Sequence, residues 1–189
     1  TKGAMTRLVD GAWTAPDWAP FSDAIDGDVP FFAPNGERVY FISTGATPDQ
    51  PRSNRERIWF ADRRGESWKD ARLVDRVVND VPQHWQFSVD SRHTIYFSAD
   101  LPGGHGAGDL YAAPMCDGKW SAPVELGPPV NSPADEATPF ISPNGDYLIF
   151  QRDGDLFISY RNEESWTPPR SLGGSINTTF KELCPIVSP

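Results

Sequence analysis

Acidic residues and one histidine recur at fixed positions relative to a set of regularly spaced tryptophans. The tryptophans are Trp13, Trp68, Trp120 and Trp166. Eleven residues before the last three stand Arg57, Asp109 and Asp155, and sixteen residues after them stand His84, Glu136 and Glu182. Carboxylate oxygens suit a divalent cation such as Ca²⁺. Alternatively, each carboxylate accepts hydrogen bonds from backbone N–H groups of its own loop, as a feature repeated along a chain usually does.

Other catalytic arrangements are weakly indicated. His84, His93 and His105 form no His-x-x-x-His pair, and no Gly-x-Ser-x-Gly elbow is present. A Ser–His–Asp triad assembles in space, so the sequence leaves it open. A glycosidase needs two carboxylates, and nothing singles out two of the 26 acidic residues. The sequence therefore leaves catalysis uncertain and favours a noncatalytic protein.

Aromatic and glycine-rich segments offer two further candidates. The four regular tryptophans could stack on sugars, but their repetition favours packing within the fold. Trp18, Trp59 and Trp85 break that spacing, and Trp85, which follows His84, is the best candidate for a functional aromatic residue. The segment 103–108, Gly-Gly-His-Gly-Ala-Gly, lacks the Lys-Ser/Thr of a phosphate-binding loop and is read as a flexible connection.

The elements that would position these residues are repeated hairpins. Ser142-Pro143-Asn144-Gly145 separates two apolar runs, and Ala33-Pro34-Asn35-Gly36 does the same. Asn-Gly accepts the positive φ of a tight hairpin turn. Each repeat predicts four antiparallel strands and no helix. The strands are expected near 29–33, 38–43, 57–62 and 67–74, then 84–88, 94–99, 109–114 and 119–126, then 138–142, 147–151, 155–160 and 165–172.

Four strands per repeat, with tryptophans spaced 46 to 55 residues apart, are typical of a β-propeller blade. We expect an all-β fold, with three complete blades in one propeller domain over 1–189. The blades lie near 21–75, 81–127 and 134–173, with partial blades at 1–20 and 180–189. Arg57, His84, Asp109, Glu136, Asp155 and Glu182 would then gather near one face.

Composition limits the partners. The 189 residues carry a formal charge of −9 and include 19 prolines and 16 glycines, which suits a turn-rich fold. The negative charge argues against nucleic acid as a partner. No apolar run is long enough to enter a membrane as a span, and the given sequence shows no signal-peptide pattern, which leaves the compartment open. Cys116 and Cys184 are expected to be buried free thiols.

The motifs together resemble a known repeat. Trp-x-x-Pro, Leu-Gly, Asn-Ser/Thr, Glu-x-x-Pro and Ser-Pro-Asn-Gly follow one another from Trp120, and the same order recurs from Trp166 as far as Ser188-Pro189. This order resembles the TolB-like, WD-type β-propeller repeat of bacteria. The resemblance implies a periplasmic or secreted protein that binds a protein, small molecule or carbohydrate. Val89-Asp90-Ser91 departs from the Pro-Asn-Gly turn, and Arg57 departs from the aspartate of the other repeats.

We therefore expect a noncatalytic binding or scaffold module with its site at His84, Trp85, Asp109, Glu136, Asp155 and Glu182. A carbohydrate-active or hydrolytic enzyme with an acidic central site is the alternative. No cofactor is expected apart from a possible divalent cation. The partial blades predict a small closed ring, a ring shared by two chains, or a part of a larger ring. Open blade edges would favour self-association.

Overall fold

The computed structural model describes residues 4–19, 27–45, 55–65, 67–82, 86–163 and 165–187, and these form an all-β protein. Several antiparallel sheets are present, and none of the described sheets closes on itself. One short helix, α1 (Arg76–Asn79), corrects the expectation of no helix. No helix of the described part could span a membrane. The chain divides into two compact units, Thr1–Val74 and Asp75–Pro189, described in turn.

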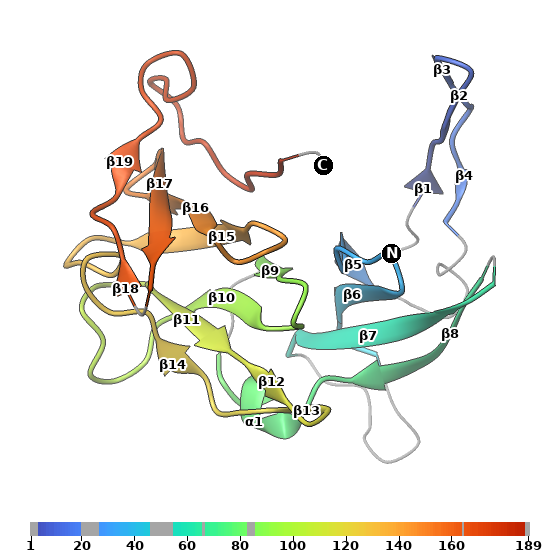
Figure 1. Cartoon of the computed structure of the whole chain (residues 1–189), viewed down its shortest axis with the longest axis horizontal. Helices are drawn as coiled ribbons and strands as arrows, with labels where there is room; N and C mark the ends of the chain where they lie inside the picture. The colour runs from blue at the N-terminus through green and yellow to red at the C-terminus, as the bar shows by residue number, and fades with distance from the viewer. Residues whose placement is uncertain are drawn as a thin grey trace. The chain divides into compact units, whose positions relative to one another are not determined.

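The first unit contains a four-stranded sheet and an N-terminal ribbon (Figure 1). The sheet runs in chain order through β5 (Asp28–Phe32), β6 (Arg38–Ser43), β7 (Arg57–Arg64) and β8 (Ser67–Leu73). In the ribbon, β1 (Ala4–Met5) pairs with β4 (Asp17–Trp18), and β2 (Leu8–Val9) pairs with β3 (Ala12–Trp13). Ala19, Val39, Phe41, Trp59 and Ala61 form the buried core. The four predicted strands of the first repeat are confirmed.

The second unit contains two larger sheets. One has the order β14 (Val124–Glu125), β11 (Asp109–Ala113), β10 (Ile95–Ala99) and β9 (Phe87–Val89). The other contains β15 (Glu136–Ile141), β16 (Tyr147–Arg152), β17 (Asp155–Asn162), β18 (Ser165–Trp166) and β19 (Arg170–Ser171). β12 (Met115–Cys116) pairs with β13 (Lys119–Trp120).

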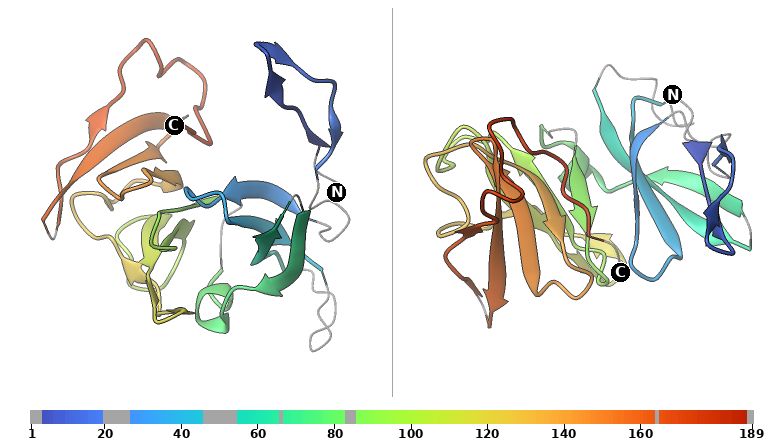
Figure 2. Two further views of the ribbon diagram at one scale, coloured as in Figure 1. Left: turned by 45° about the vertical axis from the view of Figure 1, so that its right-hand side comes forward. Right: turned by 90° about the horizontal axis from the view of Figure 1, so that it is seen from above.

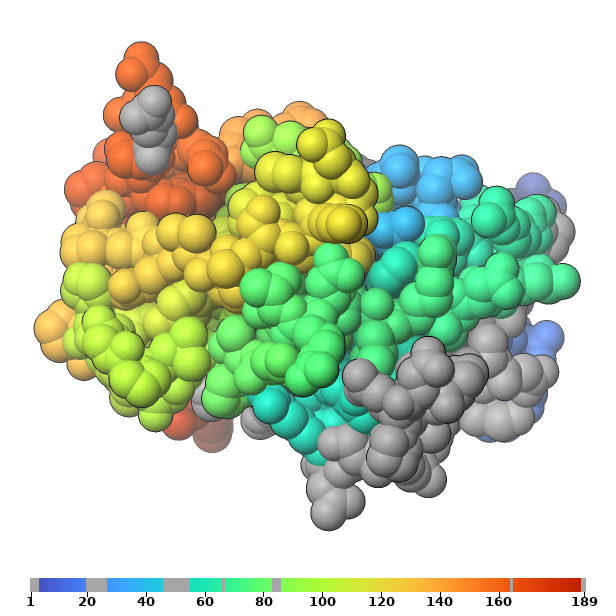
Figure 3. All heavy atoms as spheres, turned by 90° about the horizontal axis from the view of Figure 1, so that it is seen from below, coloured from blue at the N-terminus to red at the C-terminus, as the bar shows by residue number. Residues whose placement is uncertain are grey.

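The two larger sheets of the second unit lie side by side, with β15 against β9, β10 and β11 (Figure 2). The Ser88 hydroxyl accepts a hydrogen bond from the Ile141 amide across this contact, at 2.9 Å. Tyr96, Leu110, Ile141, Leu148 and Phe150 belong to their shared core. In the space-filling view, α1, the 101–108 loop and the segments around β12 to β14 form one continuous surface of this unit (Figure 3).

The same aromatic pair recurs in the three sheets. Phe41 stacks on Trp59 at 6.3 Å between ring centroids, and Phe97 stacks on Tyr111 at 6.1 Å. Phe150 stacks on Phe157 at 6.4 Å. In each pair, one ring lies on the second strand of its sheet and the other on the third strand. The ring on the third strand directly follows Ile58, Leu110 or Leu156 in the sequence. The sequence register between repeats is therefore also a structural register.

The expected hairpin turns are present. Gly36 and Gly145 have φ of 70° and 78°, and each donates its amide to the residue three positions earlier. In the divergent second turn, His93 has φ of 62° and donates to the Asp90 carbonyl. Histidine tolerates this left-handed conformation better than β-branched residues do. The Asp90 carboxylate also accepts bonds from the Arg92 and Thr94 amides, each at 2.9 Å.

Proline splits the fourth strand of two sheets. We expected continuous strands over 119–126 and 165–172. In the structure, β13 and β14 are separate around Pro123, and β18 and β19 are separate around Pro169. Proline has no N–H group for the ladder. The first repeat has Ala71 at this position, and its fourth strand, β8, is continuous.

The tryptophans and cysteines agree only partly with expectation. Trp120 and Trp166 are each 7% exposed, which confirms their packing role. Trp13 is 70% exposed, because it lies on a two-stranded ribbon without a covering sheet, so the packing role predicted for it is wrong.

Cys116 and Cys184 are free, as expected, but both are exposed rather than buried. Cys116 lies at the end of a two-residue strand, and Cys184 follows the last strand.

The segment after β19 repeats the backbone path that leads into β15. Asn131 brackets Leu110, accepting from its amide at 2.9 Å and donating to its carbonyl at 3.1 Å. Asn177 brackets Leu156 in the same way, at 2.8 and 3.0 Å. Positive φ recurs at Thr138 (47°) and Cys184 (58°). Residues 183–187, expected to form a strand, pair with no described strand.

Candidate functional site

Four of the predicted site residues fall into two equivalent pairs. The Glu136 amide donates to the carbonyl of Gly108, directly before Asp109, at 2.9 Å. The Glu182 amide donates to the carbonyl of Gly154, directly before Asp155, also at 2.9 Å. The backbone of each glutamate therefore lies beside the start of a third strand, β11 for Glu136 and β17 for Glu182. This confirms the predicted equivalence of Glu136 and Glu182.

Glu136 is occupied by structural contacts. Its side chain is fully buried and accepts bonds from the Ser132 amide at 3.0 Å and the Ser132 hydroxyl at 2.5 Å. Arg152 donates its Nε to the same carboxylate at 2.7 Å. The Arg152 guanidinium also donates to the Val130 carbonyl at 2.7 Å and lies over the Phe157 ring. These contacts join a loop to two strands and leave Glu136 no open side toward a ligand.

Glu182 has loop contacts of its own, separate from those of Glu136. Glu182 accepts bonds from the Thr178 amide and hydroxyl at 3.1 and 2.6 Å, which repeats the Ser132–Glu136 motif. Arg57 lies in the first unit, at the start of β7. His84 and Trp85 lie outside the described residues. Ligand binding by these residues stays a prediction.

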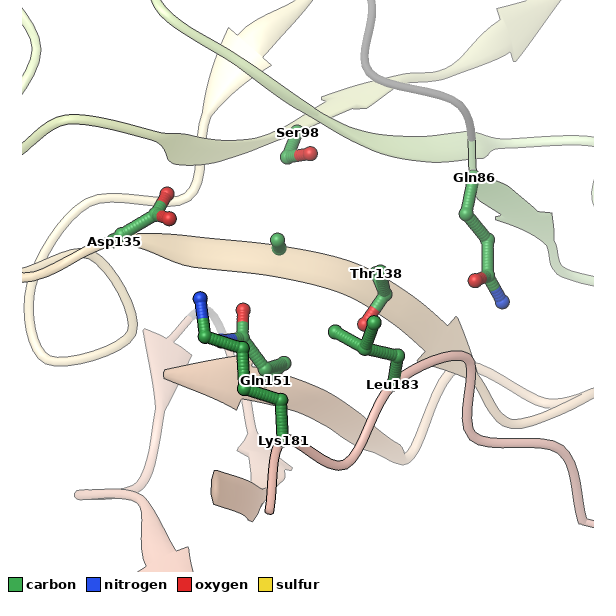
Figure 4. Close-up of a pocket in the computed structure, with 8 residues that line it drawn as sticks. Gln86, Ser98, Asp135, Thr138, Gln151, Lys181 and Leu183 are labelled. Carbon is green, nitrogen blue, oxygen red and sulfur yellow. The ribbon is translucent and has the colours of Figure 1, made fainter. Parts of the chain in front are cut away.

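The structure shows a hollow in the second unit that the sequence did not indicate. It has a volume of about 240 Å³ and is bordered by β10, β15, β16 and the segment after β19 (Figure 4). The lining consists of Gln86, Ser98, Asp135, Ala137, Thr138, Gln151, Lys181 and Leu183. Lys181 and Leu183 enter from the C-terminal segment, while Ser98 and Gln86 lie across the β15 ribbon from them (Figure 4). This volume lies below the range of about 300–1,000 Å³ typical of pockets for drug-sized ligands, so the hollow suits only a small molecule.

Three polar atoms of the lining are buried and have no hydrogen-bond partner among the described residues. They are Oε1 of Gln86, Oγ of Ser98 and Oγ1 of Thr138. Gln86 is 8% exposed and Ser98 is 1% exposed. Buried polar groups in folded proteins are nearly always bonded, and each unbonded one costs about 1–3 kcal/mol. Three such atoms around one hollow therefore indicate a place that polar molecules occupy.

A β-bulge places Thr138 at the hollow. The register of β15 against β16 shifts between Ala137 and Phe140, and Thr138 within this shift has φ of 47°. A positive φ is costly for a β-branched residue and persists only where the surrounding structure imposes it. Val29 has φ of 50° in the corresponding shift of β5. The bulge is therefore a repeated backbone feature. At this position the first repeat has Val29, which has no hydroxyl, whereas the third repeat has the hydroxyl of Thr138.

Sequence reasoning missed this hollow because its residues form no motif. Serine, threonine and glutamine are common on strands, and the three come from positions 86, 98 and 138. A usable signal was Gln151, a polar residue that directly follows the apolar run 148–150 of β16. Polar residues that interrupt apolar strands in neighbouring repeats mark a shared polar surface.

Comparison with known proteins assigns no family. No family model matches the chain, and no curated protein matches its sequence. The resemblance to the TolB-like repeat therefore stays a prediction.

Proposed function

We propose that this chain is a noncatalytic binding module of the β-propeller type, and that it binds a small polyhydroxylated molecule in the hollow. The observation that carries the proposal is the set of three buried, unpartnered polar atoms on Gln86, Ser98 and Thr138. Each lies on the lining of the same hollow.

The chemistry of these atoms favours hydroxyl groups on the ligand. Oε1 of Gln86 can only accept a hydrogen bond, while the hydroxyls of Ser98 and Thr138 can donate or accept. A ligand hydroxyl can also do both, so a polyol satisfies all three atoms with one kind of group. Lys181 adds donors and Asp135 adds acceptors at the same lining. Leu183 and Ala137 offer apolar contact for the carbon skeleton.

The lining favours binding over hydrolysis. Asp135 is the one carboxylate among the described lining residues. A glycosidase of the common type needs two carboxyl groups flanking the bond to be broken. Glu136, the residue next to Asp135, is committed to Arg152 and Ser132. The described site therefore supports recognition without bond cleavage.

The propeller assignment is part of the same proposal. Three sheets share the same order of strands, the stacked aromatic pair and the hairpin turn between the first two strands. Consecutive sheets of such repeats pack face to face in propellers, and their first strands border the central channel. The hollow is bordered by the first strand of one sheet, β15, and by Lys181 and Leu183 of the segment that repeats its path.

Calorimetric titration with monosaccharides and cyclic polyols tests the proposal. Ser98→Ala and Thr138→Val each remove an unpartnered hydroxyl, and valine is already found at positive φ at position 29. We expect both variants to weaken binding at least tenfold without lowering stability, because removing an unbonded hydroxyl breaks no hydrogen bond and relieves the cost of burying it. Ser121→Ala, at an exposed serine, is the control.

Two results would overturn the proposal. One is the absence of binding for every monosaccharide and polyol at millimolar concentration. The other is binding that Ser98→Ala and Thr138→Val leave at the strength of the Ser121→Ala control. Either result would assign the hollow to ordered water, which also satisfies buried polar groups.

A further inference from the structure

A second cluster of polar side chains shares no residue with the lining of the hollow. His105, Asp109 and Glu125 each bring one potential ligand atom within 4.8 Å of the other two. His105 belongs to the loop before β11, Asp109 begins β11, and Glu125 ends β14. The Nδ1 atom of His105 lies 2.6 Å from Oε1 of Glu125. Only Asp109 of these three was expected to bind a ligand.

Glycines allow the loop to close over Asp109. A Cβ atom on Gly104 would lie 2.1 Å from Oδ2 of Asp109, and one on Gly106 would lie 2.0 Å from the Ala134 carbonyl oxygen. A side chain at either position would therefore force the neighbouring atoms to shift. Close packing therefore explains the glycines of this segment. The prediction of a flexible connection did not account for this packing. The packing holds His105 next to the carboxylate.

The Asp109 carboxylate gives the second, independent observation. The residue is 1% exposed, and its Oδ2 accepts bonds from the amides of His105 and Gly106 at 2.8 and 3.3 Å. Its other oxygen, Oδ1, is buried and has no hydrogen-bond partner among the described residues. An anionic oxygen removed from water without a partner is strongly unfavourable. A bound cation would supply the missing interaction.

We propose that His105, Asp109 and Glu125 form a binding site for a divalent transition-metal ion, with Zn²⁺ the best match. One imidazole and two carboxylates fit the ligands of Zn²⁺, while Ca²⁺ prefers an all-oxygen set. Three protein ligands leave one tetrahedral position for water.

The geometry needs a small adjustment that the site permits. Ligands of a tetrahedral Zn²⁺ lie about 3.3 Å apart when the bonds are about 2.0 Å long. The side chains of His105 and Glu125 are 38% and 26% exposed, so both can rotate while Asp109 stays fixed. Asn131 supports the site from behind, donating to Oε1 of Glu125 at 3.0 Å. Such supporting bonds orient metal ligands in known sites.

Titration of chelator-treated protein with Zn²⁺ tests the proposal. We expect one Zn²⁺ per chain, a higher melting temperature with Zn²⁺, and weaker binding of Ca²⁺. His105→Asn and Glu125→Gln should each weaken Zn²⁺ binding at least tenfold. His93→Asn is the matched control, because asparagine tolerates the positive φ of position 93 and the backbone carbonyl that accepts from Trp120 remains.

Asp109→Asn has a separate use, because it keeps an acceptor for the His105 and Gly106 amides. We expect it to fold and to lose Zn²⁺ binding, with Co²⁺ as a spectroscopic probe of the remaining coordination. The proposal is overturned by the absence of Zn²⁺ binding, by tighter binding of Ca²⁺ than of Zn²⁺, or by binding that His105→Asn and His93→Asn weaken equally. It does not depend on the polyol site, because no residue is shared between them.

Discussion

The buried ion pair between Glu136 and Arg152 gives a prediction with an internal control. Glu136→Gln removes the negative charge from a fully buried side chain and places an NH₂ group against donors from Ser132 or Arg152. Breaking a buried pair typically costs about 3–5 kcal/mol. Arg152 keeps the Val130 carbonyl and is 20% exposed, so we expect a loss of about 3–4 kcal/mol.

Glu182→Gln is the matched control. Glu182 accepts both Thr178 bonds through Oε1 alone, and glutamine keeps that oxygen. Its Oε2 is buried without a hydrogen-bond partner among the described residues, so replacing it by NH₂ sacrifices no hydrogen bond. We expect a change in unfolding free energy within about 1 kcal/mol of zero, because no buried ion pair is broken.

Urea denaturation followed by circular dichroism measures both changes. A loss of about 3–4 kcal/mol corresponds to a fall in melting temperature of about 10 °C for a chain of this size. If the two units unfold separately, the change belongs to the transition of the second unit. Adding Arg152→Met to Glu136→Gln should cost about 1–3 kcal/mol less than the sum of the single changes. Equal losses for Glu136→Gln and Glu182→Gln would refute the reasoning.

Three further predictions concern packing and pH. Trp120→Ala and Trp166→Ala should each cost about 3–5 kcal/mol in thermal or urea unfolding, whereas the exposed Trp13→Ala should stay within about 0.5 kcal/mol. Asn131→Ala removes both bonds that bracket the start of β11 and should cost about 2–4 kcal/mol in the same assay. Burial raises the pKa of Tyr96 above its ordinary value of 10.0, so its contribution is present below pH 10 and is lost as pH rises through the folded-state pKa. Tyr96→Phe should therefore reduce the alkaline loss of stability, and an unchanged pH profile would contradict this assignment.

The strands could be predicted because local signals agree along the repeats. Asn35-Gly36 and Asn144-Gly145 mark the turns, and the apolar runs beside them become β6 and β16 at almost the expected boundaries. The split of the fourth strand had a visible signal in Pro123 and Pro169, because proline cannot donate to a ladder. The short helix α1 had no such signal, since four residues are too few for a helical period.

The sites were harder to predict because they depend on long-range contacts. The equivalence of Glu136 and Glu182 followed from their spacing, but the Arg152 partner that distinguishes them did not. Asp109 was a candidate from its position, while His105 and Glu125 join it only after β11 pairs with β14. The polar atoms of the hollow come from separate segments, and their missing partners become apparent only in three dimensions.

The repeated path after β19 has a consequence for how such a chain can be lengthened. The path into β15 is fixed by hydrogen bonds of Asn131, Ser132 and Glu136. The same bonds recur 46 residues later, at Asn177, Thr178 and Glu182. The segment takes this path although no described strand pairs with residues 183–187. The loop at the end of a repeat thus fixes the backbone path of the segment that follows it. A tandem duplication of residues 131–176, which are 46 residues, would place a second copy of Asn131, Ser132 and Glu136 at the same spacing after Leu156, so gene duplication would repeat the bonds that fix this path.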